Sequence, residues 1–112
     1  MPTNIKTIQN DSTESVIAYN SENVENSFWV KQNETYDPKL GLWISWHENQ
    51  PLILRTKKGL CHIWDKDWKI HGLWEDESEE IIFLNGKEQG VGGNTKVTIA
   101  SEGSISMKKA AT

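Results

Sequence analysis

Apolar residues along the chain occur in clusters of four to six, separated by turn-forming residues at short and fairly regular intervals. No window of twelve residues sustains the 3.6-residue period of an amphipathic helix. This pattern is typical of antiparallel sheets and predicts a small single-domain antiparallel β-sandwich or barrel of about 8–10 short strands. The expected strands are residues 15–19, 27–32, 41–46, 52–55, 60–64, 69–74, 80–84, 87–91, 95–100 and 103–107.

Two turns have sequences with a clear conformational reason. Asn85-Gly86 suits the two positive-φ positions of a type I′ turn, so it predicts a hairpin. Gly59 closes the link 56–59 with a residue that has no Cβ strain, and it predicts a second hairpin.

The N-terminal segment reads differently from the rest of the chain. Residues 1–14 contain two isolated Ile and are otherwise small or polar, so we interpret them as a polar tail or an edge strand. A single all-β domain is then expected over residues 15–112. Because an edge strand can pair with a second copy of the chain, a homodimer stays open.

The supply of core residues is small. Leu, Ile, Val and Phe make up 25 of the 112 residues, just above the roughly 20% below which a highly charged chain tends to stay unfolded. Trp is the extreme value, with six residues, and each buried aromatic side chain removes roughly 150–250 Å² from water. The tryptophans are therefore expected to complete the core or to form a ligand site.

The charge balance argues against one class of partner. The formal net charge is −4, so the polyanionic backbone of DNA or RNA would be repelled on average, and we predict no nucleic-acid partner. The basic residues Arg55, Lys57 and Lys58 fall at an expected turn and are interpreted as solvated. Residues 75–80 form an acidic run with five carboxylates.

The cysteine content and the N-terminal residues predict the cellular compartment of the protein. Cys61 is the only cysteine, so no intramolecular disulfide can form, whereas small secreted domains commonly depend on several. Residues 1–15 lack the basic and apolar regions of a secretory signal. No apolar stretch approaches the roughly 18 residues that span a bilayer. We therefore expect a cytoplasmic protein without a transmembrane segment, with release by a leaderless route left open.

Strand alternation assigns the tryptophans to different faces. Leu42, Ile44 and Trp46 share one face of an expected strand. Trp43 lies on the other face, so we expect it to point away from the core. For Trp43 and Trp74, core packing and ligand contact are left as equal alternatives.

Trp68 is a different case, because it lies in a polar link between two strands, where there is little core to reach. Asp65 and Asp67 precede it in the same link. An indole face can stack on the apolar C–H face of a pyranose, while carboxylates bind its hydroxyls at about 0.5–1.5 kcal/mol per net hydrogen bond. We predict a ligand site at Trp68, Asp65 and Asp67, with Trp43 or Trp74 as a neighbouring platform.

No set of residues points to catalysis. Cys61 and His62 are adjacent, so in a strand their side chains lie on opposite faces and cannot pair as nucleophile and base. The spacing of His62, the following aspartates and His71 matches no metal signature. The glycines in 90–93 precede a strand, whereas a phosphate-binding loop precedes a helix. We expect a protein that is not an enzyme, with no catalytic residues, cofactor or metal.

The leading hypothesis is non-catalytic, lectin-like carbohydrate binding through Trp-bearing loops, with a glycan or another small ligand as partner. A first alternative is binding to lipid headgroups, because exposed Trp rings favour the membrane interface. A second is an acidic protein-interaction module, such as an inhibitor, immunity or accessory protein. Its contact residues would be Glu75, Asp76, Glu77, Glu79 and Glu80. A barrel that encloses a small ligand is a third alternative.

Overall fold

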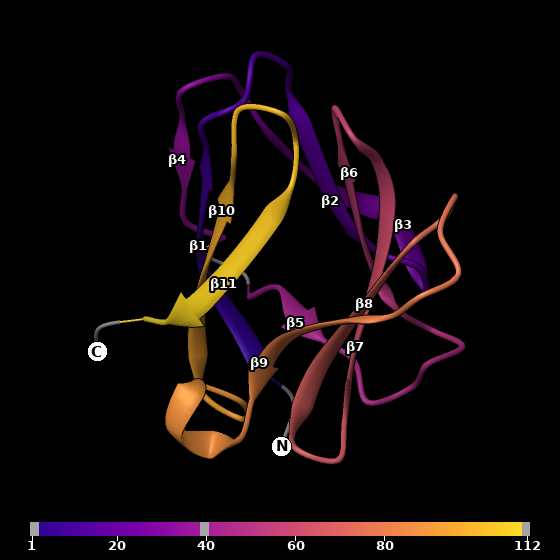
Figure 1. The fold of residues 1–112 in the computed structure, drawn as a ribbon. Coiled ribbons are helices and arrows are strands. Elements are labelled where there is room, and N and C mark those ends of the chain that lie inside the picture. The colour runs from indigo at the N-terminus through magenta and orange to yellow at the C-terminus, as the bar shows by residue number, and fades with distance from the viewer. Residues whose placement is uncertain (1–2, 39–40, 111–112) are drawn as a thin grey trace.

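The fold consists of two β-sheets that face each other across the apolar core (Figure 1). The computed structural model describes residues 3–38 and 41–110, which contain eleven strands and one short 3-10 helix. The predicted all-β class is confirmed. These described ranges hold no helix with the length and hydropathy of a membrane span.

The first sheet combines both ends of the chain. It contains β1 (Thr3–Asn10), β4 (Thr35–Tyr36), β5 (Trp43–Ile44), β10 (Asn94–Ile99) and β11 (Ile105–Lys109). Its strand order is β11-β10-β1-β4, and β5 also pairs with β1. The β1–β10 pair is parallel, whereas the other pairs are antiparallel. This one parallel pair departs from the antiparallel prediction, because it joins segments too distant for any local pattern to relate them.

The interpretation of residues 1–14 as a polar tail or edge strand is wrong for β1, which lies between β10 and β4. Ile5 and Ile8 are fully buried. The buried polar residues of β1 have partners inside the fold. The side-chain nitrogen of Asn10, for example, donates to the carbonyl of Val30 at 3.0 Å. Satisfied polar groups therefore allow a strand with few apolar residues to occupy the middle of a sheet.

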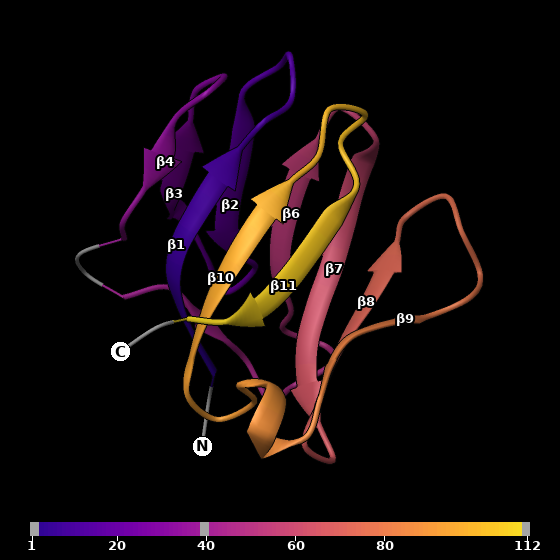
Figure 2. The ribbon, with the colours of Figure 1, turned by 60° about the vertical axis from the view of Figure 1, so that its left-hand side comes forward.

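The second sheet carries most of the predicted strands. It contains β2 (Val16–Asn20), β3 (Asn23–Val30), β6 (Leu52–Thr56), β7 (Gly59–Lys66), β8 (Lys69–Trp74) and β9 (Ile81–Asn85). All pairs are antiparallel in the order β3-β2-β6-β7-β8-β9, and Figure 2 shows this sheet behind the first. The hairpin predicted at Gly59 is confirmed, because Thr56 pairs with Gly59, whose φ is +137°.

The hairpin predicted at Asn85-Gly86 is wrong, and so is the strand predicted over 87–91. Of these two residues, Gly86 has a positive φ, +89°, and Asn85 does not, whereas a type I′ turn needs a positive φ at both positions. The chain continues into the 3-10 helix η1 (Lys87–Gln89). The side-chain oxygen of Gln89 accepts a hydrogen bond from the backbone N–H of Asn85 at 2.8 Å. This bond and the 3-10 turn hold residues 85–89 in a compact loop, so residues 87–91 do not return along β9 as a strand.

Two tryptophans of the described ranges are buried: Trp64 is 3% exposed and stacks on His71, whereas Trp74 is 1% exposed and belongs to the core between the sheets. Trp74 shares the inner face of β8 with Ile70, which is fully buried. The ammonium group of Lys58 lies 5.1 Å from the centre of the Trp74 ring, which is a favourable cation–π distance. The alternative that Trp74 contacts a ligand is therefore wrong, because core packing occupies its indole.

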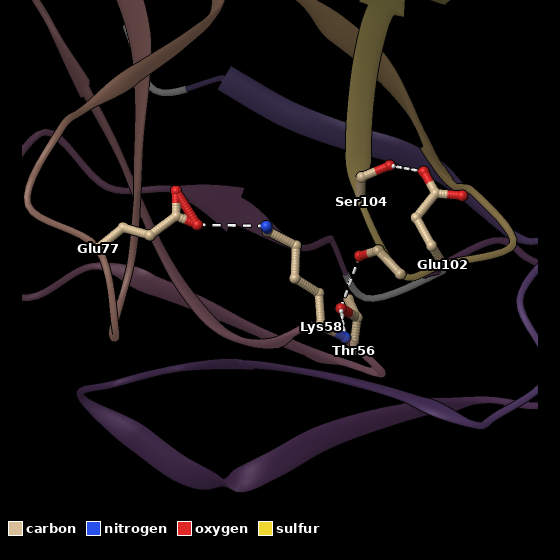
Figure 3. Close-up of polar contacts among 6 residues, drawn as sticks. Thr56, Lys58, Glu77, Glu102 and Ser104 are labelled. Carbon is tan, nitrogen blue, oxygen red and sulfur yellow. Dashed lines mark hydrogen bonds and ion pairs between the residues drawn. The ribbon is translucent and has the colours of Figure 1, made fainter.

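The β6–β7 and β10–β11 turns join the two sheets (Figure 3). The hydroxyl of Thr56 donates to the carbonyl of Gly103 at 2.6 Å and accepts from the N–H of Lys58 at 3.1 Å. Gly103 has φ +94°, and a Cβ on it would lie 2.5 Å from the backbone nitrogen of Lys58. The close approach of the two turns therefore requires glycine at this position.

Candidate functional site

The β7–β8 hairpin ends in a two-residue turn formed by Asp67 and Trp68. Lys66 and Lys69 pair at its base, and the central residues have φ values of +54° and +57°. Positive φ at both positions is the requirement of a type I′ turn, which normally selects Asn-Gly. A Cβ-bearing residue in this conformation costs roughly 1–2 kcal/mol. The Gly86 N–H donates to the carbonyl of Trp68 at 2.7 Å, so the strained turn is held from outside the hairpin.

A second Trp lies beside this hairpin, on the loop that follows β5. The carbonyl of Ser45 accepts the N–H of Asp65 at 2.8 Å, and its hydroxyl accepts the N–H of His47 at 3.0 Å. Trp46 lies between Ser45 and His47 in the sequence, and 55% of its surface is exposed. The prediction that Trp46 shares the core face is wrong, because β5 ends at Ile44 and the alternation stops there.

The two tryptophans belong to one cleft. Its lining residues are Trp46, Asp65, Lys66, Asp67 and Trp68. Its volume is about 400 Å³, within the range of roughly 300–1,000 Å³ that is usual for small-ligand sites. Trp68 is 52% exposed, so the cleft presents two half-exposed indoles next to one ammonium group and two carboxylates. Three of these residues, Trp68, Asp65 and Asp67, were expected from the sequence to lie together.

Asp65 has a structural role as well as a place in this cleft. It is only 7% exposed, and its carboxylate accepts a hydrogen bond from the hydroxyl of Thr3 at 2.9 Å. Thr3 is itself fully buried and accepts the N–H of Gly92 at 2.8 Å. Loss of hydration raises the pKa of Asp65, and the hydrogen bond from Thr3 opposes this rise. Asp65 therefore connects β7 to β1, and its contact with a ligand stays a prediction.

Replacing Asp65 with Asn is expected to remove a pH dependence of stability. Because the pKa of Asp65 is raised on folding, the folded state binds this proton more tightly than the unfolded chain. The contribution of Asp65 to the free energy of unfolding therefore rises as pH falls from the folded-state pKa to the unfolded-state pKa. The amide of the variant can still accept the Thr3 hydroxyl, but it does not titrate. Urea unfolding of both proteins should be measured between about pH 4 and pH 7. The free energy of unfolding of the wild type should increase relative to that of Asp65→Asn as the pH falls. A difference that stays constant or shrinks would contradict this assignment.

Trp43 lies away from this cleft. It is 49% exposed, as alternation along its strand predicts. However, Trp43 pairs with Asn4 of β1 and lines a different hollow with Phe28 and Tyr36. The prediction that Trp43 or Trp74 forms a platform beside Trp68 is therefore wrong for both residues, since one lines another hollow and the other belongs to the core.

Cysteine and histidine side chains offer no paired nucleophile in the described ranges. Cys61 is fully buried, and burial raises the pKa of its thiol to about 12, so it stays protonated at neutral pH. His71 stacks on Trp64 with ring centres 5.4 Å apart, and its Nδ1 lies 3.3 Å from a carboxylate oxygen of Glu80. Within residues 3–38 and 41–110, no three His, Cys, Asp or Glu side chains are grouped as metal ligands.

The acidic segment 75–80 is exposed along its whole length in the β8–β9 loop. Glu77 forms an ion pair with Lys58 at 3.2 Å (Figure 3), and Glu80 reaches His71. The other three carboxylates of the segment form no ion pair with the described part of the chain. The use of this segment as a protein-binding surface stays a prediction.

The chain was compared with protein-family models, with curated proteins and with solved structures. None of the three comparisons gives a match. The function of the cleft has therefore to be inferred from the chemistry of its own residues.

Proposed function

We propose that the cleft between Trp46 and Trp68 binds carbohydrate without catalysing a reaction. The main support is the presence of two half-exposed indoles on one cleft of about 400 Å³. An indole face packs on the apolar C–H face of a pyranose and removes apolar surface of both partners from water. The positive φ of Trp68 adds support, because strained residues cluster at binding and catalytic sites.

The charged side chains of the cleft suit the hydroxyl groups of a sugar. A hydroxyl both donates and accepts hydrogen bonds, and the cleft offers the Asp67 carboxylate as acceptor and the Lys66 ammonium group as donor. Each net bond contributes about 0.5–1.5 kcal/mol. A few such bonds and stacking on two rings together correspond to a dissociation constant of about 1 mM, or about −4 kcal/mol.

The charge of the cleft favours neutral sugars. Its lining contains two carboxylates, Asp65 and Asp67, against the single ammonium group of Lys66. A sialylated or sulfated glycan would bring further negative charge close to these carboxylates, and like charges repel each other. We therefore expect neutral hexoses and their oligomers to bind more tightly than acidic glycans of the same size.

A titration with neutral mono- and oligosaccharides, followed by intrinsic Trp fluorescence, tests the proposal. The wild type should show a saturable change. Trp46→Ala should weaken binding by at least about tenfold, equivalent to about 1.4 kcal/mol, because one of the two stacking surfaces is lost.

The matched control for this titration is Trp29→Ala. Trp29 is 60% exposed on β3 and does not line the cleft, so its removal deletes the same side chain from an unrelated surface. This variant should bind sugars as the wild type does. The proposal fails if no sugar changes the wild-type spectrum, or if Trp46→Ala binds as tightly as Trp29→Ala.

A further inference from the structure

A second hollow, distinct from the proposed glycan cleft, lies where β3 of one sheet meets β4 and β5 of the other. It has a volume of about 510 Å³. Three aromatic side chains line it, and each comes from a different strand: Phe28, Tyr36 and Trp43. It shares no lining residue with the cleft of Trp46 and Trp68. The two sites are therefore separate, and a ligand proposed for this hollow does not depend on sugar binding in the cleft.

The charged residues among the described lining of this hollow are all acidic. Glu22 and Glu25 belong to its lining, and the described lining residues include no basic side chain. Both glutamates are exposed, and neither forms an ion pair with the described part of the chain. The remaining polar lining residues are neutral amides and a hydroxyl. These two carboxylates therefore favour a cation over an anion in the hollow.

Two of the aromatic residues that line the hollow, Phe28 and Tyr36, pack against each other, and Trp43 adds a third ring to the lining. The rings of Phe28 and Tyr36 have centres 5.7 Å apart and planes inclined by 54°. The indole of Trp43 rests on Gly41, where an added Cβ would lie 2.9 Å from the indole nitrogen. Gly41 also has φ +82°, which disfavours any other residue. A side chain at position 41 would therefore clash with the Trp43 indole in its present position.

We infer that this hollow binds a small organic cation through a quaternary ammonium group. Such a group has no N–H to donate, so it needs no hydrogen-bond acceptors placed at fixed angles. Its methyl groups pack on aromatic faces, and its charge is attracted to the electron-rich faces of the rings and to nearby carboxylates. A strongly hydrated cation such as Na⁺ would have to give up its water to contact three aromatic rings, and this loss opposes its binding.

Choline chloride and tetramethylammonium chloride are the probes, titrated at constant ionic strength against NaCl and followed by Trp fluorescence and by calorimetry. We expect saturable binding of both. The uncharged isostere of choline, 3,3-dimethylbutan-1-ol, should bind at least about tenfold more weakly, because it has the same shape without the charge. Equal binding of choline and this alcohol would overturn the proposal.

Two variants locate the binding. Trp43→Ala should weaken choline binding by about tenfold or more. The double variant Glu22→Gln and Glu25→Gln alters only exposed side chains, so the fold should persist even if Trp43→Ala folds poorly. This double variant should also weaken choline binding, and more so at low salt, where charge attraction is less screened. Unchanged affinity in the double variant would overturn the proposal.

Controls separate this site from the glycan cleft and identify the carrier of the cation. Trp46→Ala should leave choline binding unchanged, and the Glu22, Glu25 double variant should leave sugar binding unchanged. If Trp46→Ala loses choline binding instead, the site is wrongly placed and the proposal fails. Displacement of choline by phosphatidylcholine vesicles, or by a peptide with trimethyllysine, supports the proposal and shows which molecule presents the group.

Discussion

Trp68→Gly is expected to abolish measurable sugar binding while leaving the free energy of unfolding within about 1 kcal/mol of the wild type. The indole of Trp68 is 52% exposed, so its removal costs only part of the packing energy of a buried ring. Glycine also relieves the cost of φ +57°, which is roughly 1–2 kcal/mol for a residue with a Cβ. Loss of packing and relief of strain therefore nearly cancel.

Trp68→Ala makes this prediction sharper. Alanine removes the indole but keeps the Cβ, so the strain at this position remains. Trp68→Gly should therefore be more stable than Trp68→Ala by about 1 kcal/mol, although in ordinary strand positions glycine is the less stable of the two. Both variants should lose sugar binding, because neither offers a ring on which to stack.

Urea unfolding of the three proteins, with sugar titrations on the same samples, provides the measurement. Retained sugar affinity in either variant would show that Trp68 does not contact the ligand. A loss of more than about 3 kcal/mol in Trp68→Gly would show that the indole is part of the core, since losses of that size come from buried aromatic residues. In that case the proposed cleft would be a packing feature.

Trp74→Ala should produce the opposite result, a loss of about 3–5 kcal/mol in the free energy of unfolding. Trp74 is 1% exposed among aliphatic side chains of both sheets, so truncation leaves a large cavity that the neighbouring strands cannot fill. The favourable contact with the Lys58 ammonium group is lost as well. Since domains of this size are stable by roughly 5–15 kcal/mol, the variant should be close to unfolding at 37 °C.

The control for Trp74→Ala is again Trp29→Ala, which removes an exposed ring and should change stability by less than about 0.5 kcal/mol. Trp74→Phe keeps a buried aromatic ring, so its loss of free energy of unfolding should lie between those of Trp74→Ala and Trp29→Ala. Equilibrium unfolding in urea measures all three. A loss below about 1 kcal/mol in Trp74→Ala would mean that the core closes around the missing ring, contrary to the packing described above.

Local pattern was sufficient for much of the second sheet. The strand expected over 69–74 has the same bounds as β8, and the hairpin at Gly59 forms as expected. Both depend on neighbours in sequence, through alternation of side chains and the backbone freedom of glycine. The prediction at Asn85-Gly86 used the same reasoning and is wrong, because the chain enters a 3-10 helix whose Gln89 side chain bonds back to Asn85, and turn preferences do not include such a contact.

The candidate site was only partly predictable for a similar reason. Trp68 was expected in a polar link over residues 65–68. Trp68 does lie in the β7–β8 turn, but β7 continues to Lys66, so Asp65 belongs to the strand and not to the link. Trp46 was missed because its exposure depends on where β5 ends, which is decided by pairing with β1. The polar residues 47–50 that follow Trp46 are the signal that could have revealed a loop there.

The all-β class, most strands of the second sheet, the outward position of Trp43 and the position of Trp68 between two strands could all be predicted from local pattern. These features follow from periodicity and turn chemistry within a few residues. The central position of β1, the burial of Trp74 in the core and the meeting of Trp46 with Trp68 in one cleft could not be predicted in this way. Each of these outcomes depends on contacts between segments distant along the chain, such as β1 with β10 and Ser45 with Asp65. Burial is a property of such contacts, and no local pattern records which segments will make them.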